Sequence, residues 1–212
     1  MKWKLLEQIP DAEVQRLLSI ARRRKFARGE VVFHQHDPAD TLHLVDKGRF
    51  AVRVTTPLGD TAILSVLGPG DVFGELALLG ESGQRSATVA ALEAGETRSI
   101  HQLDFDRMRA EHPSTTDVLI AILAGQVRRL SGHLVEALYL PADKRVRRRL
   151  CEAAAFYDGV VPLTQEDLAE LAGTSRATVN KVLRDDEERG IVALGRGRTT
   201  VLDPEALARR AR

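Results

Sequence analysis

Cysteine is almost absent from this 212-residue chain, which contains Cys151 alone. One thiol cannot close an intrachain disulfide, nor can it supply a multi-cysteine zinc site or an iron–sulfur cluster. Long apolar runs are also missing, since no 18 consecutive residues are apolar and Met1–Lys4 leads into no signal-peptide core. We therefore expect a cytoplasmic protein with no membrane partner, in which Cys151 is a small buried residue on a helix.

Neither sign of charge is in excess, because the formal net charge is +1. Any affinity for nucleic acid would therefore depend on where individual charges lie. Signatures of common catalytic sites are missing too: there is no Ser/His/Asp set and no carboxylate pair, and Gly68-Pro69-Gly70 lacks the Lys-Ser/Thr of a phosphate-binding loop. His34 and His36 share a face of an extended segment, but no third ligand converges with them. We expect neither an enzyme nor a metal site.

The first half of the chain predicts a β domain. Residues 5–25 have the pattern of short helical pieces, the second of which opens at Pro10-Asp11. Short β-prone runs then follow at regular spacing from Glu30 to about Leu103, separated by turn signals. These runs are Val31–Phe33, Leu42–Val45, Phe50–Val54, Ala62–Val66 and Ala87–Ala90. Such spacing is typical of a small antiparallel barrel or jelly roll.

Two helical patterns come next. Phe105 begins a short helix that stops before Pro113, and a longer pattern runs from about Ser114 to Leu140. Apolar residues on the long helix recur at a 3-4-3-4-3 spacing, the seam of a coiled coil: Ile120, Leu123, Val127, Leu130, Leu134 and Ala137. The seam could pack on the chain's own barrel. A helix of this length outruns such a barrel, so we favour pairing with a second copy as a homodimer.

Residues 163–202 predict a winged helix-turn-helix. Thr164 is a good N-cap for a short helix, and Gly173 supplies the turn after it. Ser175 caps a second helix, which Gly190 closes. Two β-prone runs then flank the segment 195–198, which predicts a β-hairpin wing with two arginines at its tip.

In such a unit the first turns of the second helix face base edges, and the wing contacts phosphates. Arginine can bond a guanine through O6 and N7, and lysine or asparagine can add a contact. We expect DNA binding from the cap, helix and wing residues Thr164, Gln165, Thr174, Ser175, Arg176, Ala177, Thr178, Asn180, Lys181, Arg196 and Arg198. The preceding helix, 144–156, has a basic face that contains Arg145 and 147–149; it is either solvated or close to DNA phosphates.

Two segments carry a resemblance. The run 68–76, which contains Phe73-Gly74-Glu75-Leu76, and the run 85–89, which begins with Arg85-Ser86-Ala87, resemble the phosphate-binding cassette of the CRP/FNR (cyclic AMP receptor protein) family. The resemblance extends from about residue 10 to residue 203 and is specific to this family in its order of motifs.

The resemblance implies that backbone N–H groups near Gly74 and Leu76, together with the Arg85 guanidinium, hold a cyclic phosphate. It also implies that Glu75 accepts a hydrogen bond from the ribose hydroxyl and that the Ser86 hydroxyl donates one to the phosphate. The implied effector-binding residues are Phe73, Gly74, Glu75, Leu76, Arg85, Ser86, Ala87, Leu130 and Ser131. Effector binding would reorient the two DNA-reading helices of a homodimer.

Several residues depart from the family pattern. Leu130-Ser131 stands where cyclic-AMP-responsive members have Thr-Ser, so the first adenine contact is missing, while Ser131 could still act across the dimer. Ala177 replaces an acidic residue of many relatives, so the usual operator sequence does not carry over in full. Asp186 stands at a normally apolar position, and we expect it to tilt outward or pair with an arginine. His36 replaces a common glycine, which indicates a surface turn.

We therefore predict an α+β protein with an effector-binding jelly roll (1–113), a dimerisation helix (114–140) and a winged helix-turn-helix (141–212). Its predicted function is that of a homodimeric transcriptional regulator that binds a two-fold symmetric DNA site and contacts RNA polymerase. Cyclic AMP is the first candidate effector; another nucleotide, or activity without an effector, remains open. A regulatory subunit of a kinase or channel is an alternative, but residues 163–202 would have no role there. A structural DNA binder with a vestigial barrel is a further alternative.

Overall fold

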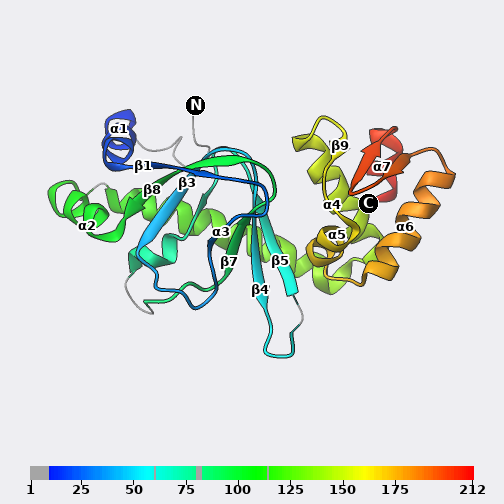
Figure 1. Ribbon diagram of the computed structural model, residues 1–212, viewed down its shortest axis with the longest axis horizontal. Coiled ribbons are helices and arrows are strands. Elements are labelled where there is room, and N and C mark those ends of the chain that lie inside the picture. The colour runs from blue at the N-terminus through cyan, green and yellow to red at the C-terminus, as the bar shows by residue number, and fades with distance from the viewer. Residues whose placement is uncertain (1–9, 60, 80–82, 114) are drawn as a thin grey trace. The chain divides into compact units, whose positions relative to one another are not determined.

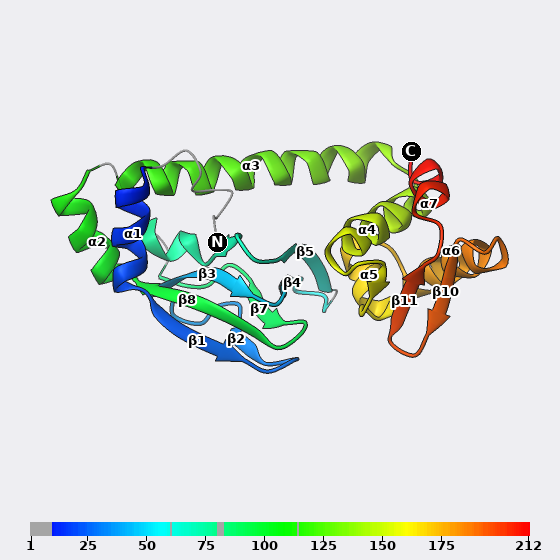
Figure 2. The same ribbon diagram turned by 90° about the horizontal axis from the view of Figure 1, so that it is seen from above.

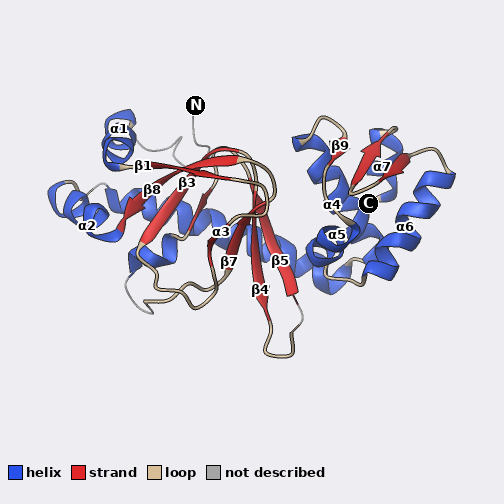
Figure 3. Cartoon of the chain, viewed as in Figure 1, coloured by secondary structure: helices blue, strands red, loops and turns tan. Residues whose placement is uncertain are grey.

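The computed structural model describes residues 10–59, 61–79, 83–113 and 115–212, and Figure 1 shows its helices and strands. The chain divides into two compact units. The first comprises residues up to 60 together with 64–130, and the second comprises 61–63 together with 131–212. Strands dominate the first unit, whereas helices dominate the second (Figure 3).

The first unit is a jelly roll of two four-stranded sheets with antiparallel pairing. One sheet has the order β1 (Arg22–Phe26), β8 (Gly95–His101), β3 (Thr41–Lys47) and β6 (Val72–Phe73). The other has the order β2 (Val31–Phe33), β7 (Thr88–Ala91), β4 (Phe50–Thr55) and β5 (Thr61–Leu67). Each run that was predicted to be extended overlaps one of these strands, and the predicted jelly roll is confirmed.

Aromatic side chains fill the jelly-roll core. The rings of Phe26 and Phe50 meet edge to face with centroids 5.7 Å apart, and Phe50 and Phe73 lie 5.5 Å apart. A second core cluster forms under the helices α1 (Asp11–Ile20), α2 (Gln102–Glu111) and the first part of α3 (Thr115–Tyr139). Figure 2 shows α1 and α2 at the N-terminal end of α3. These helices bury Leu17, Phe105, Leu119 and Ile122.

The structure corrects three predictions in this unit. Residues 22–25, which were predicted as helix, form β1, because each of them pairs with a residue of β8 and the Arg23 side chain lies 3.8 Å from Glu96. Strands β6 and β8 were not predicted, since neither has a long apolar run. Helix α2 begins at Gln102 and not at Phe105, because the ring of His101 accepts a hydrogen bond from the Leu103 backbone and caps it.

Helix α3 presents two different faces. Leu119 and Ile122 are buried in the first unit. The predicted seam lies mainly elsewhere: Ile120, Val127, Leu130, Leu134 and Ala137 are exposed, and only Leu123 packs partly against the core. By length and composition α3 could also cross a membrane, but charged residues sit in its middle and one face packs on the jelly roll. An exposed apolar stripe on such a helix is suited to pairing with another helix.

The second unit contains helices and a small sheet. After the last part of α3 come α4 (Ala142–Phe156), β9 (Val160–Val161), α5 (Gln165–Ala172), α6 (Arg176–Glu188), β10 (Val192–Gly195), β11 (Arg198–Val201) and α7 (Pro204–Arg210). The strand order is β10-β11-β9, so the predicted two-stranded wing gains a third strand. Cys151 lies half-buried on α4, where burial raises the pKa of its thiol and so makes it less reactive at neutral pH.

The arginines of α4 make ion pairs and hydrogen bonds within the second unit, so the prediction of a solvated face is wrong for Arg147 and Arg149. Arg147 and Arg149 are buried, and Arg148 and Arg149 both pair with Glu136. Arg147 Nε donates to Asp186 Oδ2 at 2.9 Å, and Arg147 Nη1 donates to Asp143 at 2.8 Å. Arg210 Nε of α7 lies 3.0 Å from the other oxygen of Asp186. The predicted pairing of Asp186 with an arginine is therefore confirmed.

We expect Arg147→Ala to lower the free energy of unfolding by about 3–5 kcal/mol, because it leaves a fully buried carboxylate with one cation fewer. Urea unfolding followed by circular dichroism measures this loss. Arg184→Ala is the matched control, since Arg184 makes an exposed i,i+3 pair with Glu187, and such pairs contribute only about 0–1 kcal/mol. Equal losses in the two variants would show that the buried cluster contributes no more than a surface pair.

Candidate effector pocket and nucleic-acid interface

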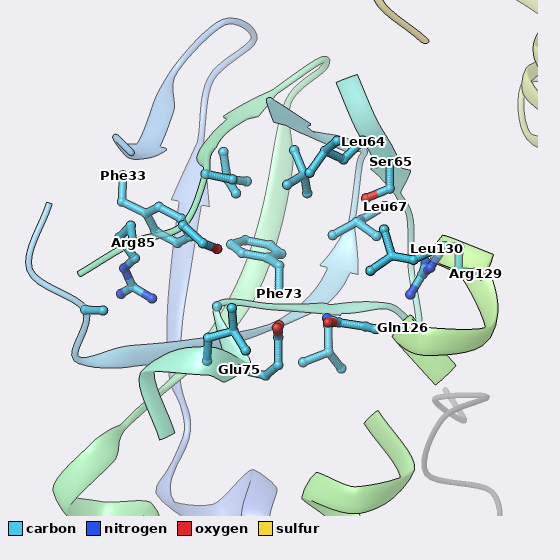
Figure 4. A pocket seen from close by; sticks show the side chains of 18 of the residues that line it. Phe33, Leu64, Ser65, Leu67, Phe73, Glu75, Arg85, Gln126, Arg129 and Leu130 are labelled. Carbon is cyan, nitrogen blue, oxygen red and sulfur yellow. The ribbon is translucent and has the colours of Figure 1, made fainter. Parts of the chain in front are cut away.

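A pocket of about 200 Å³ opens between the strands of the jelly roll and helix α3 within the first unit (Figure 4). All of the predicted effector residues line it except Ser131, namely Phe73, Gly74, Glu75, Leu76, Arg85, Ser86, Ala87 and Leu130. Ser131 is exposed on α3 and is absent from the lining. The pocket thus brings together residues from two segments that the sequence analysis had joined only by resemblance.

Arg85 lies in this pocket as a buried cation, 5% exposed. Its Nη1 donates to the carbonyl of Thr41 and its Nη2 to the hydroxyl of Thr41, both at 2.7 Å. Asp40 lies 3.4 Å from Nη2, and the guanidinium stands 4.0 Å from the centroid of the Phe33 ring. Nε has no hydrogen-bond partner among the residues that the structure describes. A buried N–H without a partner is costly, and Arg85 lines the pocket, so its positive charge favours an anionic ligand there.

Gly74 allows the backbone to pass close to that guanidinium. Its φ is +76°, and a Cβ built there would lie 2.8 Å from both Arg85 Nη1 and the Thr41 carbonyl. Only glycine adopts this conformation without strain and leaves that space open. The short 3₁₀ helix η2 (Glu75–Leu79) begins directly after it.

Glu75 is the carboxylate of the pocket. It is 5% exposed, and burial raises the pKa of its carboxyl, although a hydrogen bond with the Gln126 side chain and the charges of Arg129 and Arg85 oppose that shift. Figure 4 shows Glu75 and Gln126 side by side at the floor of the pocket. Buried between two cations, Glu75 is suited to accept a hydrogen bond from a ligand hydroxyl.

Several lining residues were missed by sequence reasoning. Phe33, Leu64 and Ser65 come from the strands, and Gln126 and Arg129 come from α3. None of them belongs to the cassette motif. Phe33, Gln126 and Arg129 also lie far from it in the sequence, whereas Leu64 and Ser65 lie just before the run 68–76. The position of Leu130 in the resemblance was the only signal that pointed to this part of α3.

His43 supports the pocket from behind. Its ring stacks on Phe73 with centroids 4.9 Å apart, and its Nδ1 lies 3.0 Å from the Thr97 hydroxyl. Its Nε2 lies 3.4 Å from the Thr41 hydroxyl, which also receives the Arg85 hydrogen bond. Burial, followed by the charges of Arg85 and Arg24, lowers the pKa of His43 to about 3. His43 is therefore neutral, and it lies close to the Thr41 hydroxyl that accepts the hydrogen bond from the cationic Arg85.

His34 and His36, the two histidines considered as metal ligands, lie at a turn. His36 has a φ of +74°, which fits its place at a common glycine position, and the Asp37 carboxylate accepts the His34 N–H at 2.7 Å. Within the described ranges, no group of three or more His, Cys, Asp or Glu side chains is arranged to hold a metal ion.

The second unit contains the predicted helix-turn-helix. The Thr164 hydroxyl accepts the Asp167 N–H, and the Asp167 side chain accepts the Thr164 N–H, which forms a capping box on α5. Gly173 ends α5 with a φ of +58°, and the Ser175 side chain caps α6. Arg145 of α4 donates to the carbonyls of Ala172 and Gly173 at 2.8 and 3.0 Å. These two hydrogen bonds from Arg145 therefore fix the turn between α5 and α6, a role that the sequence did not indicate.

One face of α6 is exposed. Val179, Val182 and Leu183 are buried, which turns the opposite face outward. Of the predicted DNA-binding residues, Arg176, Ala177, Asn180 and Lys181 are exposed on this face, together with Thr164, Ser175, Arg196 and Arg198 elsewhere in the unit. Thr174, Thr178 and Gln165 are half-buried, and the Gln165 oxygen accepts from the Asn180 amide at 3.2 Å. Arg196 and Arg198 lie at the β10–β11 turn, where Gly195 pairs with Arg198.

Comparison with known proteins gives the same two parts. The cyclic nucleotide-binding domain matches residues 23–112, and the Crp-like helix-turn-helix domain matches residues 144–210. The cyclic AMP receptor protein of Thermus thermophilus is 34% identical over 96% of this chain and 94% of its own length. The CRP-like cAMP-activated global transcriptional regulator of Mycobacterium tuberculosis is 33% identical over 88% of this chain and 87% of its own.

The solved structure of the c-di-GMP-responsive regulator CLP of Xanthomonas campestris superposes with a TM-score of 0.79. It is 20% identical and covers 91% of this chain and 99% of that one, so it supports the fold alone. A nucleotide-binding jelly roll followed by a Crp-like helix-turn-helix defines a DNA-binding transcriptional regulator. The chain belongs to the CRP/FNR family of such regulators. A regulatory subunit of a kinase or channel would not use a DNA-binding domain, so the helix-turn-helix match disfavours that alternative.

We expect the buried His43 to make the protein less stable in mild acid. Above pH 6.5 its ring is neutral in both states; between pH 6.5 and about 3 the unfolded chain takes up a proton that the folded chain does not. The free energy of unfolding should fall by about 2 kcal/mol from this residue between about pH 6.5 and about pH 5. Urea unfolding of the wild type and His43→Gln at both pH values measures it. The variant should lack this fall, the exposed-site control His34→Gln should keep it, and an unchanged fall in His43→Gln would contradict the assignment.

Proposed function

We propose that the chain is a homodimeric, sequence-specific transcription regulator gated by a cyclic nucleotide, with cyclic AMP as the effector. The observation that carries the proposal is the Arg85 side chain, a buried guanidinium at a pocket wall with an Nε–H that has no partner in the described part of the chain. A cyclic phosphate supplies the negative charge and the acceptor oxygens that a cation at the pocket wall favours.

The other pocket groups fit the same ligand. With the phosphate at Arg85, the exposed Ser86 hydroxyl and the backbone beside Gly74 supply further donors. Glu75 accepts from the ribose hydroxyl. Cyclic AMP is favoured because relatives at 33% and 34% identity are described as cAMP-activated or as a cyclic AMP receptor.

One observation favours a different nucleotide as a second candidate. Leu130 lines the pocket where a hydroxyl residue would contact adenine in cyclic-AMP-responsive relatives, and it has no polar atom in its side chain. The phosphate and ribose ends of the pocket are unaffected by this change. Activity without an effector is the remaining alternative.

The exposed stripe on α3 supports the homodimer. Val127, Leu130 and Leu134 are each at least 55% exposed, although all three are large and apolar. Pairing of this stripe with that of a second copy would bury it at a coiled-coil seam. Ser131, which lies next to the stripe and outside the pocket lining, would then be placed to approach the ligand of the partner.

The exposed face of α6 supports DNA reading. In a two-fold dimer, two copies of Arg176 at about 34 Å would enter successive major grooves on one side of the duplex. Arg196 and Arg198 would contact phosphates beside them. Such a regulator would work in the cytoplasm and meet RNA polymerase at promoters.

Gating requires that the ligand bind one arrangement of the dimer more tightly than another. Coupling of this kind is typically about 1–3 kcal/mol, which corresponds to about a 5- to 150-fold change in DNA affinity. A change of that size is large enough to switch occupancy of a promoter.

We expect isothermal titration calorimetry with cyclic AMP to give a binding heat for the wild type, and Arg85→Leu and Arg85→Lys to lose it. Circular dichroism verifies that each variant is folded. Arg176→Ala is the reciprocal control: it should bind the nucleotide as the wild type does, but lose its preference for operator over random DNA in a gel-shift titration. A folded wild type that gives no heat with cyclic AMP would refute the effector, and an Arg176→Ala protein that still discriminates would refute the DNA assignment.

We expect Leu134→Glu to convert the dimer to a monomer at micromolar concentration, because burial of two facing carboxylates at the seam is unfavourable. Sedimentation velocity measures the mass of each species. Arg128→Glu, an exposed change on the same helix outside the seam, should remain dimeric. A wild type that is monomeric at these concentrations would be incompatible with the proposed dimer.

A further inference from the structure

The effector pocket contains a second arginine that the cassette motif does not include. Arg129 of α3 lines the pocket, and its side chain is 30% exposed. Figure 4 shows Arg129 and Arg85 on opposite sides of the pocket, with Phe73 and Glu75 between them. A ligand with its phosphate at Arg85 and its ribose at Glu75 would therefore extend its base toward Arg129.

Within the described residues, Arg129 has donors that make no hydrogen bond. Its Nη1 lies 3.8 Å from Asp71 Oδ1, a separation too long for a hydrogen bond. Neighbouring groups on this side offer less to a base: Leu130 is apolar, and Gln126 is engaged with Glu75. A guanidinium carries five N–H donors and no acceptor. Arg129 is therefore the strongest donor at the end of the pocket where a base would lie.

The two purines present opposite chemistry to such a donor. Guanine offers two adjacent acceptors, O6 and N7, which a guanidinium can bond in bidentate fashion. Adenine offers N7 beside the N6 amino group, which is itself a donor and so faces the guanidinium unfavourably. With a leucine beside it, Arg129 gives this end of the pocket a preference for guanine.

We propose that Arg129 is a base-reading residue and that this pocket accepts cyclic GMP at least as tightly as cyclic AMP. The inference rests on the proposed function, because it assumes that the phosphate and ribose are held at Arg85 and Glu75. It concerns only the base, so the two ideas can fail separately.

The test measures the dissociation constants of cyclic AMP and cyclic GMP by calorimetry for the full chain. Arg129→Met removes the donors while keeping an unbranched side chain that can pack in the same place. Arg128→Met is the matched control, since Arg128 is the adjacent exposed arginine outside the pocket lining. Thermal melts verify that both variants are folded.

The wild type should bind cyclic GMP no more weakly than cyclic AMP. In Arg129→Met, affinity for cyclic GMP should fall about tenfold relative to cyclic AMP, and Arg128→Met should leave the ratio unchanged. A wild type that strongly prefers cyclic AMP would overturn the proposal. An Arg129→Met variant that weakens both nucleotides equally would overturn it as well, because Arg129 would then add charge without reading the base. Absence of binding by either nucleotide to the wild type would refute the proposed function itself, and this inference with it.

Discussion

The guanidinium of Arg85 is a buried charge, and several groups of the first unit are positioned around it. Two hydrogen bonds to Thr41, the nearby Asp40 and the ring of Phe33 keep the cation in position. Gly74 leaves the space that the guanidinium occupies, and a neutral His43 lies behind Thr41. These contacts stabilise the cation but leave Nε without a partner among the described residues. A buried cation at the wall of the pocket is the physical basis on which we propose anion binding there.

In the second unit, buried charges form ion pairs with one another and have a structural role. Asp186 is fully buried, and its carboxylate contacts both Arg147 and Arg210, so α4, α6 and α7 meet at one ion cluster. No edge of that carboxylate is directed into a pocket described here, and its effect is on the position of α6. The contrast separates a structural charge cluster from a candidate binding site: both contain a buried arginine, but Arg85 lines the described pocket and Arg147 does not.

Helix α3 contributes to the pocket and also carries the exposed seam. One face buries Leu119 and Ile122 and, further along, places Gln126 and Arg129 at the pocket, whereas another face leaves Val127 and Leu134 exposed. Residues three or four apart on a helix share a face, so the pocket-facing set and the exposed set run along the helix without competing. A ligand that contacts Arg129 therefore touches the same helical turn that would face a second copy. In the proposed homodimer, this is a direct physical route from effector binding to dimer geometry.

Local patterns in the sequence determined much of this protein. Alternating and turn-bounded runs specified most strands, and the caps Thr164 and Ser175 with Gly173 between them specified the helix-turn-helix, because such signals act through neighbouring backbone groups. Only the tertiary structure decided that the charged run 22–25 is an edge strand, that Arg145 and Arg147 are structural, and that Arg129 lines the candidate pocket. Each of those outcomes depends on a partner distant in the sequence, such as β8, Asp186 or the cassette. Charge and periodicity along the chain do not specify which distant groups will meet, since that is settled by packing.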